Sequence, residues 1–311
     1  MKQTDVVGTK PKKHNKNLKM QLQLWALMLP GLLIVLIFKY IPMYGITIAF
    51  KDVNIGQSLW DGAWVGLKHF ERLFNSELFG TIFKNTIVVT FITNFVLWPL
   101  PIIFALLVHN SKSKIARKFS QTATYLPNLI SMVVIVNIIN LFCNGETGLL
   151  NIIRQQFGLD NISFLGSEEY FLPIYFISEI WATLGANAVI YIAALSSVDT
   201  QLIEAAMIDG ASKVKRMWHI DIPAIMPTVV VLLIMNMGKM LNVGYEKFLL
   251  MQNDLNLGVS EVLSTYIYKT GLLGGQYSFS AAVNLFQNVI GIILVIVANR
   301  IAKKTADISL F

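Results

Sequence analysis

Long apolar runs alternate along this chain with shorter polar stretches. A helix needs roughly 20 mostly apolar residues to cross a bilayer, and six runs approach or exceed this length. They are Leu24–Tyr40, Phe83–Val108, Thr122–Phe142, Phe171–Leu195, Ile225–Leu241 and Ala281–Asn299. The pattern predicts an all-α, polytopic membrane protein with about six transmembrane helices.

The composition agrees with this prediction. Of the 311 residues, 55% are hydrophobic and 14% are charged, whereas ordinary soluble domains contain about 25% charged residues. The excess apolar side chains are therefore expected to face lipid. Cys143 is the single cysteine, so no disulfide can form within the chain.

The basic residues lie at particular places between the apolar runs. Most of the 25 Lys and Arg residues fall in residues 1–20 or directly after the second, fourth and sixth runs. By the positive-inside rule, this bias puts both termini in the cytoplasm of a bacterial cell. We interpret the net charge of +7 as an orientation signal, and we expect no nucleic acid partner. A cleaved signal peptide is the alternative for the first run, but no small-x-small site follows it.

The polar segment between the fourth and fifth runs has a distinctive pattern. Asp199 or Thr200 can cap a short helix that ends at Gly210, where the chain can adopt a left-handed conformation. A second short helix is expected over Ser212–Ile220, and Pro223 is expected to start the next span. Two short helices therefore meet at Gly210 on the predicted cytoplasmic side.

This segment resembles the EAA loop of permease subunits in binding-protein-dependent ABC importers. The matching residues are Glu204-Ala205-Ala206, then Gly210, then Ile220 and Pro223. The fuller pattern Glu-Ala-Ala-x-x-Asp-Gly-Ala is typical of the carbohydrate-uptake branch. Further segments resemble the lipoprotein-B-like sugar permeases, relatives of the larger maltose-type subunit: Tyr125–Ser131, Ala193–Ser197, Val262–Tyr268, Ala281–Phe286 and Ala298–Lys304.

The resemblance implies a type I ABC importer permease fold and a set of partners. Residues 1–20 would be a basic cytoplasmic tail and residues 21–311 a transmembrane permease domain, with the coupling loop at 196–227. The partners would be a second permease subunit, two ATPase subunits, an extracellular sugar-binding protein and the lipid bilayer. Within the loop, the residues expected to contact the ATPase are Glu204, Ala205, Ala206, Asp209 and Gly210.

Polar and aromatic residues inside the last three spans are candidates for a substrate path, because polar groups inside a membrane usually face the bundle interior. They are Glu179, Trp181, Thr183, Asn187, Asn236, Lys239, Asn284, Gln287 and Asn288. The alternative role for each amide is hydrogen bonding between helices. For Glu179 and Lys239, we expect a transport role or an ion pair with each other.

No catalytic or metal site is expected. The chain has no Walker A lysine motif, so ATP and Mg²⁺ are expected on the partner ATPase and no cofactor on this chain. Its four His residues are scattered, which argues against a metal site. We therefore expect a transport subunit rather than an enzyme.

The function expected from these features is uptake of an oligosaccharide by a bacterial ABC importer. The nearest alternative is the same machine with another cargo, such as a polyamine or a phosphate compound. A secondary transporter is a further alternative, although the inverted repeats that it would show are not found. A membrane-bound sensor or assembly factor that uses the loop only for docking is the third.

Overall fold

The computed structural model describes residues 14–53, 56–58 and 61–306. The chain divides into two compact units, Met1–Thr47 and Ile48–Phe311. The domain border at residue 20 stays a prediction. Residues 1–13 of the predicted basic tail lie outside the described residues, and its last part is helical from His14 onward.

The first unit is built from one long apolar helix. Helix α1 (His14–Val35) continues through a wide π-turn, Leu36–Tyr40, into a 3-10 helix that begins at Ile41 and ends at Phe50, just inside the second unit. The stretch Leu18–Phe50 is long and apolar enough to cross a membrane. The predicted first span lies within it.

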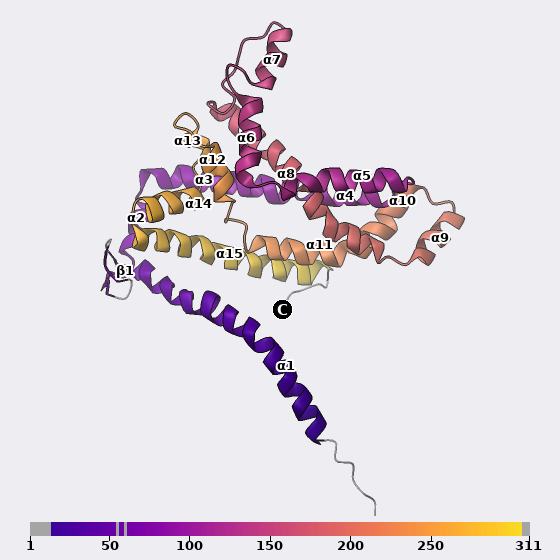
Figure 1. The fold of residues 1–311 in the computed structure, drawn as a ribbon, viewed down its shortest axis with the longest axis horizontal. Coiled ribbons are helices and arrows are strands. Elements are labelled where there is room, and N and C mark those ends of the chain that lie inside the picture. Colours follow the sequence, from indigo (N-terminus) through magenta and orange to yellow (C-terminus); the bar gives the residue numbers. More distant parts are fainter. Residues whose placement is uncertain (1–13, 54–55, 59–60, 307–311) are drawn as a thin grey trace, which may run out of the picture. The chain divides into compact units, whose positions relative to one another are not determined.

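The second unit contains fourteen of the described α-helices and one small sheet (Figure 1). The helices are α2 (Lys68–Phe74), α3 (Glu77–Phe91), α4 (Pro99–His109), α5 (Lys114–Tyr125), α6 (Met132–Cys143), α7 (Leu149–Gln156), α8 (Glu168–Ser196), α9 (Thr200–Ile208), α10 (Lys213–Arg216), α11 (Ile222–Met237), α12 (Tyr245–Met251), α13 (Leu257–Ser260), α14 (Leu263–Tyr268) and α15 (Tyr277–Ala306). Strands β1 (Lys51–Asp52) and β2 (Ala63–Trp64) pair antiparallel, with Lys51 opposite Trp64.

Among the described residues, five helices are long and apolar enough to span a membrane. They are Leu18–Phe50, Glu77–His109, Glu168–Ser196, Lys213–Met237 and Tyr277–Lys304. A sixth span arises only if Lys114–Leu129 and Met132–Cys143 are taken together, and these two segments meet at an angle of 101°. The count of about six agrees with the prediction.

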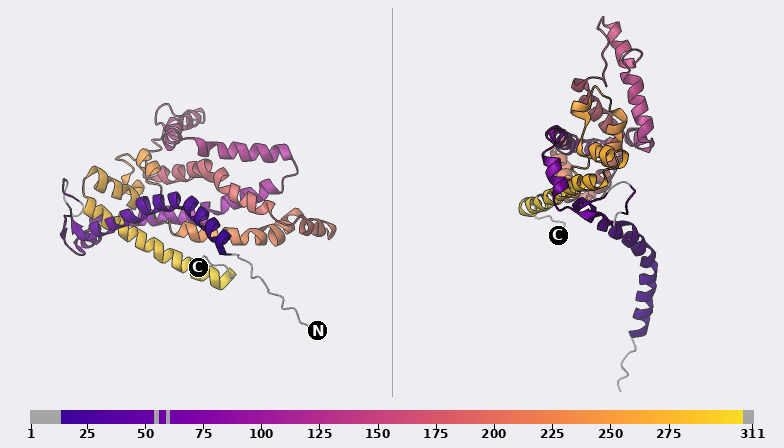
Figure 2. Two further views of the ribbon diagram at one scale, coloured as in Figure 1. Left: turned by 60° about the horizontal axis from the view of Figure 1, so that its bottom comes forward. Right: turned by 90° about the vertical axis from the view of Figure 1, so that its left-hand side faces the viewer.

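The predicted straight span Thr122–Phe142 is therefore wrong in its geometry. A short 3-10 turn containing Pro127 ends the first segment, and the Ser131 hydroxyl accepts a hydrogen bond from Val134 N to start the second. A proline followed by an N-cap serine breaks a helix even where the surrounding residues are apolar. Helix α6 consequently turns away from α5 and packs against α12, and α7 projects beyond it (Figure 1, Figure 2).

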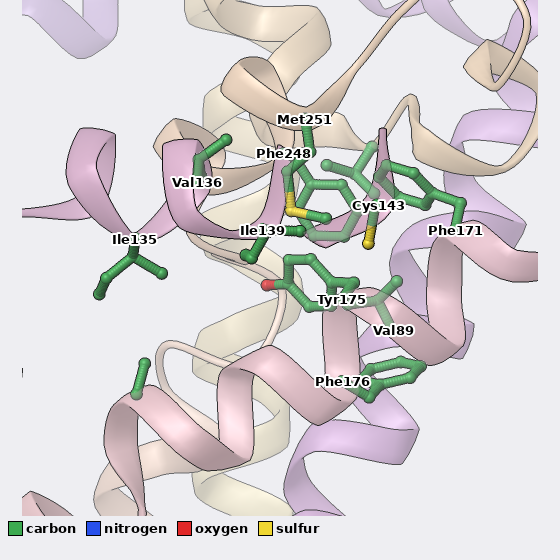
Figure 3. Close-up of a cluster of buried hydrophobic side chains, with 12 residues drawn as sticks. Val89, Ile135, Val136, Ile139, Cys143, Phe171, Tyr175, Phe176, Phe248 and Met251 are labelled. Carbon is green, nitrogen blue, oxygen red and sulfur yellow. The ribbon is translucent and has the colours of Figure 1, made fainter. Parts of the chain in front are cut away.

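Helix α8 is the centre of the second unit and packs against α4, α5, α11 and α13. Its first turns enter an aromatic core, in which Phe171 and Phe248 are fully buried. The rings of Tyr175 and Phe248 lie 4.2 Å apart between centroids, as Figure 3 shows. Buried aromatic rings of this kind dominate the energetics of a core, so α8 and α12 are held together at this end of the unit.

Three prolines follow wide helical turns of the same construction. The residue before the proline donates its N–H to the carbonyl five residues earlier: Ile41 to Leu36 before Pro42, Trp98 to Thr93 before Pro99, and Ile222 to Met217 before Pro223. Proline has no N–H, and its ring collides with the carbonyl four residues earlier in a regular helix. The wide turn moves that carbonyl aside, so each helix continues through its proline.

Helices α5 and α8 approach so closely at Gly185 that a side chain does not fit. A Cβ atom at Gly185 would lie 2.3 Å from the carbonyl carbon and oxygen of Thr124. Close approach of backbones at a small residue is a standard way for membrane helices to pack. Gly185 therefore determines how α5 lies against α8.

The variant Gly185→Ala is expected to lower the free energy of unfolding by about 1–3 kcal/mol, the usual cost of overpacking. The matched control is Gly80→Ala in α3, where a Cβ meets no atom within 4 Å and alanine improves helix propensity. Unfolding of both variants in detergent, followed by circular dichroism, measures the difference. Equal stability of the two variants would contradict the packing argument.

Candidate functional site

The segment after α8 forms two helices that meet at a left-handed glycine. The Asp199 carboxylate caps α9 by accepting a hydrogen bond from Gln201 N at 2.9 Å. Gly210 has φ +75°, and Ala211 N donates to the Ala206 carbonyl at 2.9 Å, which ends α9 in the manner of a Schellman motif. Ser212 then caps α10. The local structure expected around Gly210 is thus present.

Helix α9 lies at one end of the second unit, with α2 and α14 at the other end (Figure 1). Glu204, Ala205, Asp209 and Gly210 are exposed, and Ala206 is half-buried. Apolar side chains are exposed beside them; Ile208, for example, is 87% exposed. The five residues predicted to contact the ATPase therefore lie together on one accessible segment. Their role in coupling stays a prediction.

The expected second short helix, Ser212–Ile220, is wrong in its extent. Helix α10, the wide turn Met217–Asp221 and α11 form one continuous helix from Lys213 to Met237. Pro223 does not start a new helix because the wide turn before it accommodates its ring. The segment after Gly210 is therefore the first part of a helix long enough to span the membrane, Lys213–Met237, which we call the rod.

Asn110, the residue that follows α4, connects the rod to α4 through hydrogen bonds. Its side-chain amide donates to the carboxylate of Asp221 at 2.8 Å, and Asp221 is 2% exposed. Lys213 Nζ donates to the Asn110 carbonyl at 3.3 Å. A hydrogen bond to a buried charged group is stronger than a neutral one, so this contact clamps the rod at Asp221.

Further along the rod, a polar cavity of about 370 Å³ lies between three helical segments. Five of the nine predicted path residues line it: Glu179, Thr183, Asn187, Asn236 and Lys239. The opposite wall comes from the second predicted span and contributes Thr90, Thr93, Asn94 and Trp98. Amides, hydroxyls and aromatic rings around one space are the groups that bind sugar hydroxyls and the apolar faces of sugar rings.

The polar side chains of the cavity differ in whether their hydrogen-bonding groups are already used. Thr90 Oγ1 and Thr183 Oγ1 donate to backbone carbonyls of Met240 and Glu179, each at 2.8 Å. In contrast, the side chains of Asn187, Asn236 and Lys239 bond to no group in the described part of the chain. These three are exposed, so their donors and acceptors are available to a bound molecule.

Glu179 forms an ion pair, but with a residue that the sequence did not indicate. Its carboxylate accepts from Lys247 Nζ at 2.8 Å. Lys247 is 2% exposed and also donates to the Tyr175 carbonyl at 3.1 Å, with Nζ 4.5 Å from the Tyr175 ring centroid. The expected ion pair between Glu179 and Lys239 is wrong because the buried Lys247 ammonium takes that position.

The remaining candidates lie elsewhere. Trp181 is 43% exposed and is not among the cavity lining residues, because it lies on another face of α8 from Glu179 and Thr183. Gln287 is buried and donates to the Leu241 carbonyl, which joins α15 to the end of the rod. Asn288 is exposed and donates to Asn284 at 3.1 Å.

Asn284 and Gln287 line a second cavity of about 410 Å³. Its walls include Tyr245 and Tyr268, whose rings stack 5.4 Å apart between centroids. Asn242 lines both cavities, so the two spaces adjoin. The substrate-path interpretation of these residues stays a prediction.

Sequence reasoning missed the wall formed by the second predicted span. Thr90 and Asn94 are polar residues four positions apart in an apolar run, the same signal that identified Glu179 and Thr183. The sequence therefore contained the signal for this wall. Lys247 offered no such signal because it lies 68 positions from Glu179, in the segment between the fifth and sixth apolar runs.

Comparison with known proteins identifies the family. Residues 98–306 match the family described as "Binding-protein-dependent transport system inner membrane component". The chain belongs to this family. It is thus a membrane component of a transport system rather than an enzyme, and the family membership replaces the alternatives of a secondary transporter and of a sensor.

Relatives within the family have transport names. The chain is 42% identical to the polygalacturonan/rhamnogalacturonan transport system permease protein YteP of Bacillus subtilis (strain 168) over 92% of this chain and 89% of that protein. It is 40% identical to Protein LplB of the same organism over 94% of this chain and 92% of that one. The expected resemblance to lipoprotein-B-like permeases is confirmed.

A solved structure has the same fold. A chain of a bacterial alginate ABC transporter, crystallised with an alginate pentasaccharide-bound periplasmic protein, is similar with a TM-score of 0.87 and 34% identity. The match covers 96% of this chain and 100% of that chain. The predicted type I ABC importer permease fold is confirmed.

The buried ion pair leads to a prediction on stability. Lys247→Met is expected to lower the free energy of unfolding by about 3–5 kcal/mol, because it leaves the Glu179 carboxylate without its partner. The double variant Lys247→Met/Glu179→Gln is expected to regain most of the loss. Denaturant unfolding of the purified protein in detergent measures each value.

The control for these Lys247 and Glu179 variants is Lys68→Met. Lys68 pairs with Asp52 at 2.7 Å, but its side chain is 62% exposed, so the loss is expected to stay within about 1 kcal/mol. Additive losses in the Lys247/Glu179 double variant would show that the two groups do not depend on each other.

Proposed function

We propose that this chain is one of two different permease subunits of a bacterial ABC importer for an oligosaccharide. An extracellular binding protein delivers the sugar, and two ATPase subunits, which bind ATP and Mg²⁺, dock on the cytoplasmic side. The observation that carries this proposal is the accessible segment Glu204–Gly210 at the end of the same rod that lines the polar cavity. A docking element joined directly to the helix that lines the cargo space is what a coupled pump requires.

The orientation follows from the charges and from this segment. We place both termini and α9 in the cytoplasm, because the basic residues cluster in the tail, after the second and fourth runs and at the end of α15. Helices α2 and α14, at the opposite end of the second unit, then lie on the side from which cargo arrives.

In the proposed cycle, closure of the ATPase dimer moves α9 of this chain and the equivalent helix of the partner permease. Ala205 and Ala206 allow a close approach to the ATPase surface, since small side chains let backbones pack tightly. Glu204 supplies a charged contact. Gly210 sets the angle between α9 and the rod, so that a push on α9 tilts the rod. Such rigid-body motion alternately opens the cavity to each side.

The cargo assignment rests on the chemistry of the cavity and on the relatives. Asn187 and Asn236 offer free amides, and Trp98 supplies aromatic surface beside the same space. Two of the similar proteins have names that concern polygalacturonan or rhamnogalacturonan and alginate, which are polysaccharides. A sugar cargo is favoured over a polyamine because its many hydroxyls match amides better than a chain of ammonium groups does.

Changing Gly210 is expected to impair coupling. Gly210→Val forces a β-branched residue into a left-handed conformation, which costs about 1–3 kcal/mol, so α9 no longer lies at the angle that the ATPase needs. We expect sugar-stimulated ATP hydrolysis by the reconstituted complex to fall about tenfold, since about 1.4 kcal/mol on a barrier corresponds to a factor of about ten in rate. Glu204→Lys is expected to weaken co-purification of the ATPase.

Gly158→Val is the matched control. Gly158 has φ +72°, and a Cβ there meets no atom within 4 Å, as at Gly210, but it follows α7 rather than α9. Hydrolysis that falls equally in both variants would mean that general backbone strain, not the coupling angle, causes the loss.

The cargo is tested through the binding protein that works with this chain. Titration calorimetry against a panel of neutral and acidic oligosaccharides, polyamines and phosphate compounds is expected to give binding to an oligosaccharide alone. Selective binding of a polyamine or a phosphate compound would overturn the sugar assignment and leave the family membership unaffected.

A further inference from the structure

The charges around the polar cavity do not cancel. Of its lining residues, Glu179 and Lys239 are charged. The Glu179 carboxylate is already neutralised by Lys247, whose ammonium lies 2.8 Å away and is buried. Lys239 has no ion-pair partner among the residues that the structure describes. The cavity wall contributed by this chain therefore carries one uncompensated positive charge.

An uncompensated ammonium has a consequence when the cavity closes around its cargo. In water the ammonium is solvated, and its electrostatic cost is small. Once the pathway closes and water is displaced, the same charge is expensive unless an anion lies beside it. A neutral oligosaccharide would leave Lys239 without a counter-charge at this stage, whereas a carboxylate on the sugar would supply one.

The neighbours of Lys239 fit the rest of such a molecule. Asn236 precedes it by three residues and lines the same cavity, and Asn187 does so from α8. Both side-chain amides lack partners among the described residues, so they are available to sugar hydroxyls. Thr183 on α8 and Trp98 on the opposite wall add a polar group and an aromatic ring to the same cavity.

We propose that Lys239 binds the carboxylate of an acidic oligosaccharide, one that contains uronic acid units, and that this residue makes the permease itself selective for charged over neutral sugars. This inference rests on the proposed sugar cargo and deepens it. The Glu179–Lys247 pair contributes by removing the one lining carboxylate that would repel the cargo.

The test measures binding to the assembled importer in nanodiscs, without the binding protein, so that the selectivity of the binding protein does not enter. The two probes are trigalacturonate and its fully methyl-esterified form, which have the same sugar units and differ mainly in charge. We expect the wild-type complex to bind the acid about tenfold more tightly or better, as is usual for a buried charge pair. Lys239→Gln is expected to bring the ratio close to one.

Three further variants sharpen the result. Lys239→Arg keeps the charge and is expected to keep the preference. Asn236→Asp places a carboxylate three residues from Lys239 and is expected to abolish the preference, and it serves if Lys239→Gln fails to assemble. Lys68→Gln removes one positive charge from the exposed pair with Asp52, outside the cavity, and is expected to change nothing.

The outcomes separate this inference from the proposed function. Equal binding of the two probes by the wild-type complex, or an unchanged preference in both Lys239→Gln and Asn236→Asp, overturns the role of Lys239 and leaves a sugar cargo standing. A complex that assembles with its ATPase but binds neither probe, nor any neutral oligosaccharide, overturns the sugar cargo itself.

Discussion

Glu179 places a carboxylate inside an apolar helix, and the surrounding structure is arranged to satisfy it. The Lys247 ammonium reaches this carboxylate from α12 and is held there by the Tyr175 carbonyl and ring. The pair therefore joins α8 to α12 at the edge of the aromatic core around Phe248. Because a buried charge without a partner costs several kcal/mol, this one contact also determines the electrostatics of the adjoining cavity.

Much of the fold is predictable because the bilayer imposes a simple length rule. Four predicted spans lie within continuous apolar helices. The fifth, Ile225–Leu241, lies in the rod up to Met237 and ends in a turn. The Thr122–Phe142 prediction failed because hydropathy averages over Ser131 and does not register that this hydroxyl starts a new helix. Similarly, the 3.6-residue period placed Glu179, Thr183 and Asn187 on one face correctly, since that spacing is a local property of a helix.

The parts of the site that escaped prediction depend on tertiary contacts. Lys239 lies closer than Lys247 to the apolar runs in sequence, but Lys247 reaches Glu179 because α12 folds back against α8. Gln287 was a candidate for sugar binding, yet it bonds the Leu241 carbonyl where the rod ends. No spacing in the sequence distinguishes an amide that joins helices from one that faces a cavity.

The clamp at Asp221 divides the rod into two unequal arms. At 1.5 Å per residue, Asp221 is roughly 12 Å from Lys213 and roughly 24 Å from Met237. A rod that pivots where Asn110 holds it would move its far end about twice as far as its near end. A displacement of the α9 side by about 2 Å would then shift the cavity wall by about 4 Å, roughly the width of a carboxylate group. The position of one buried aspartate thus lets the proposed coupling turn a small displacement at α9 into a larger one at the cavity, at the cost of force.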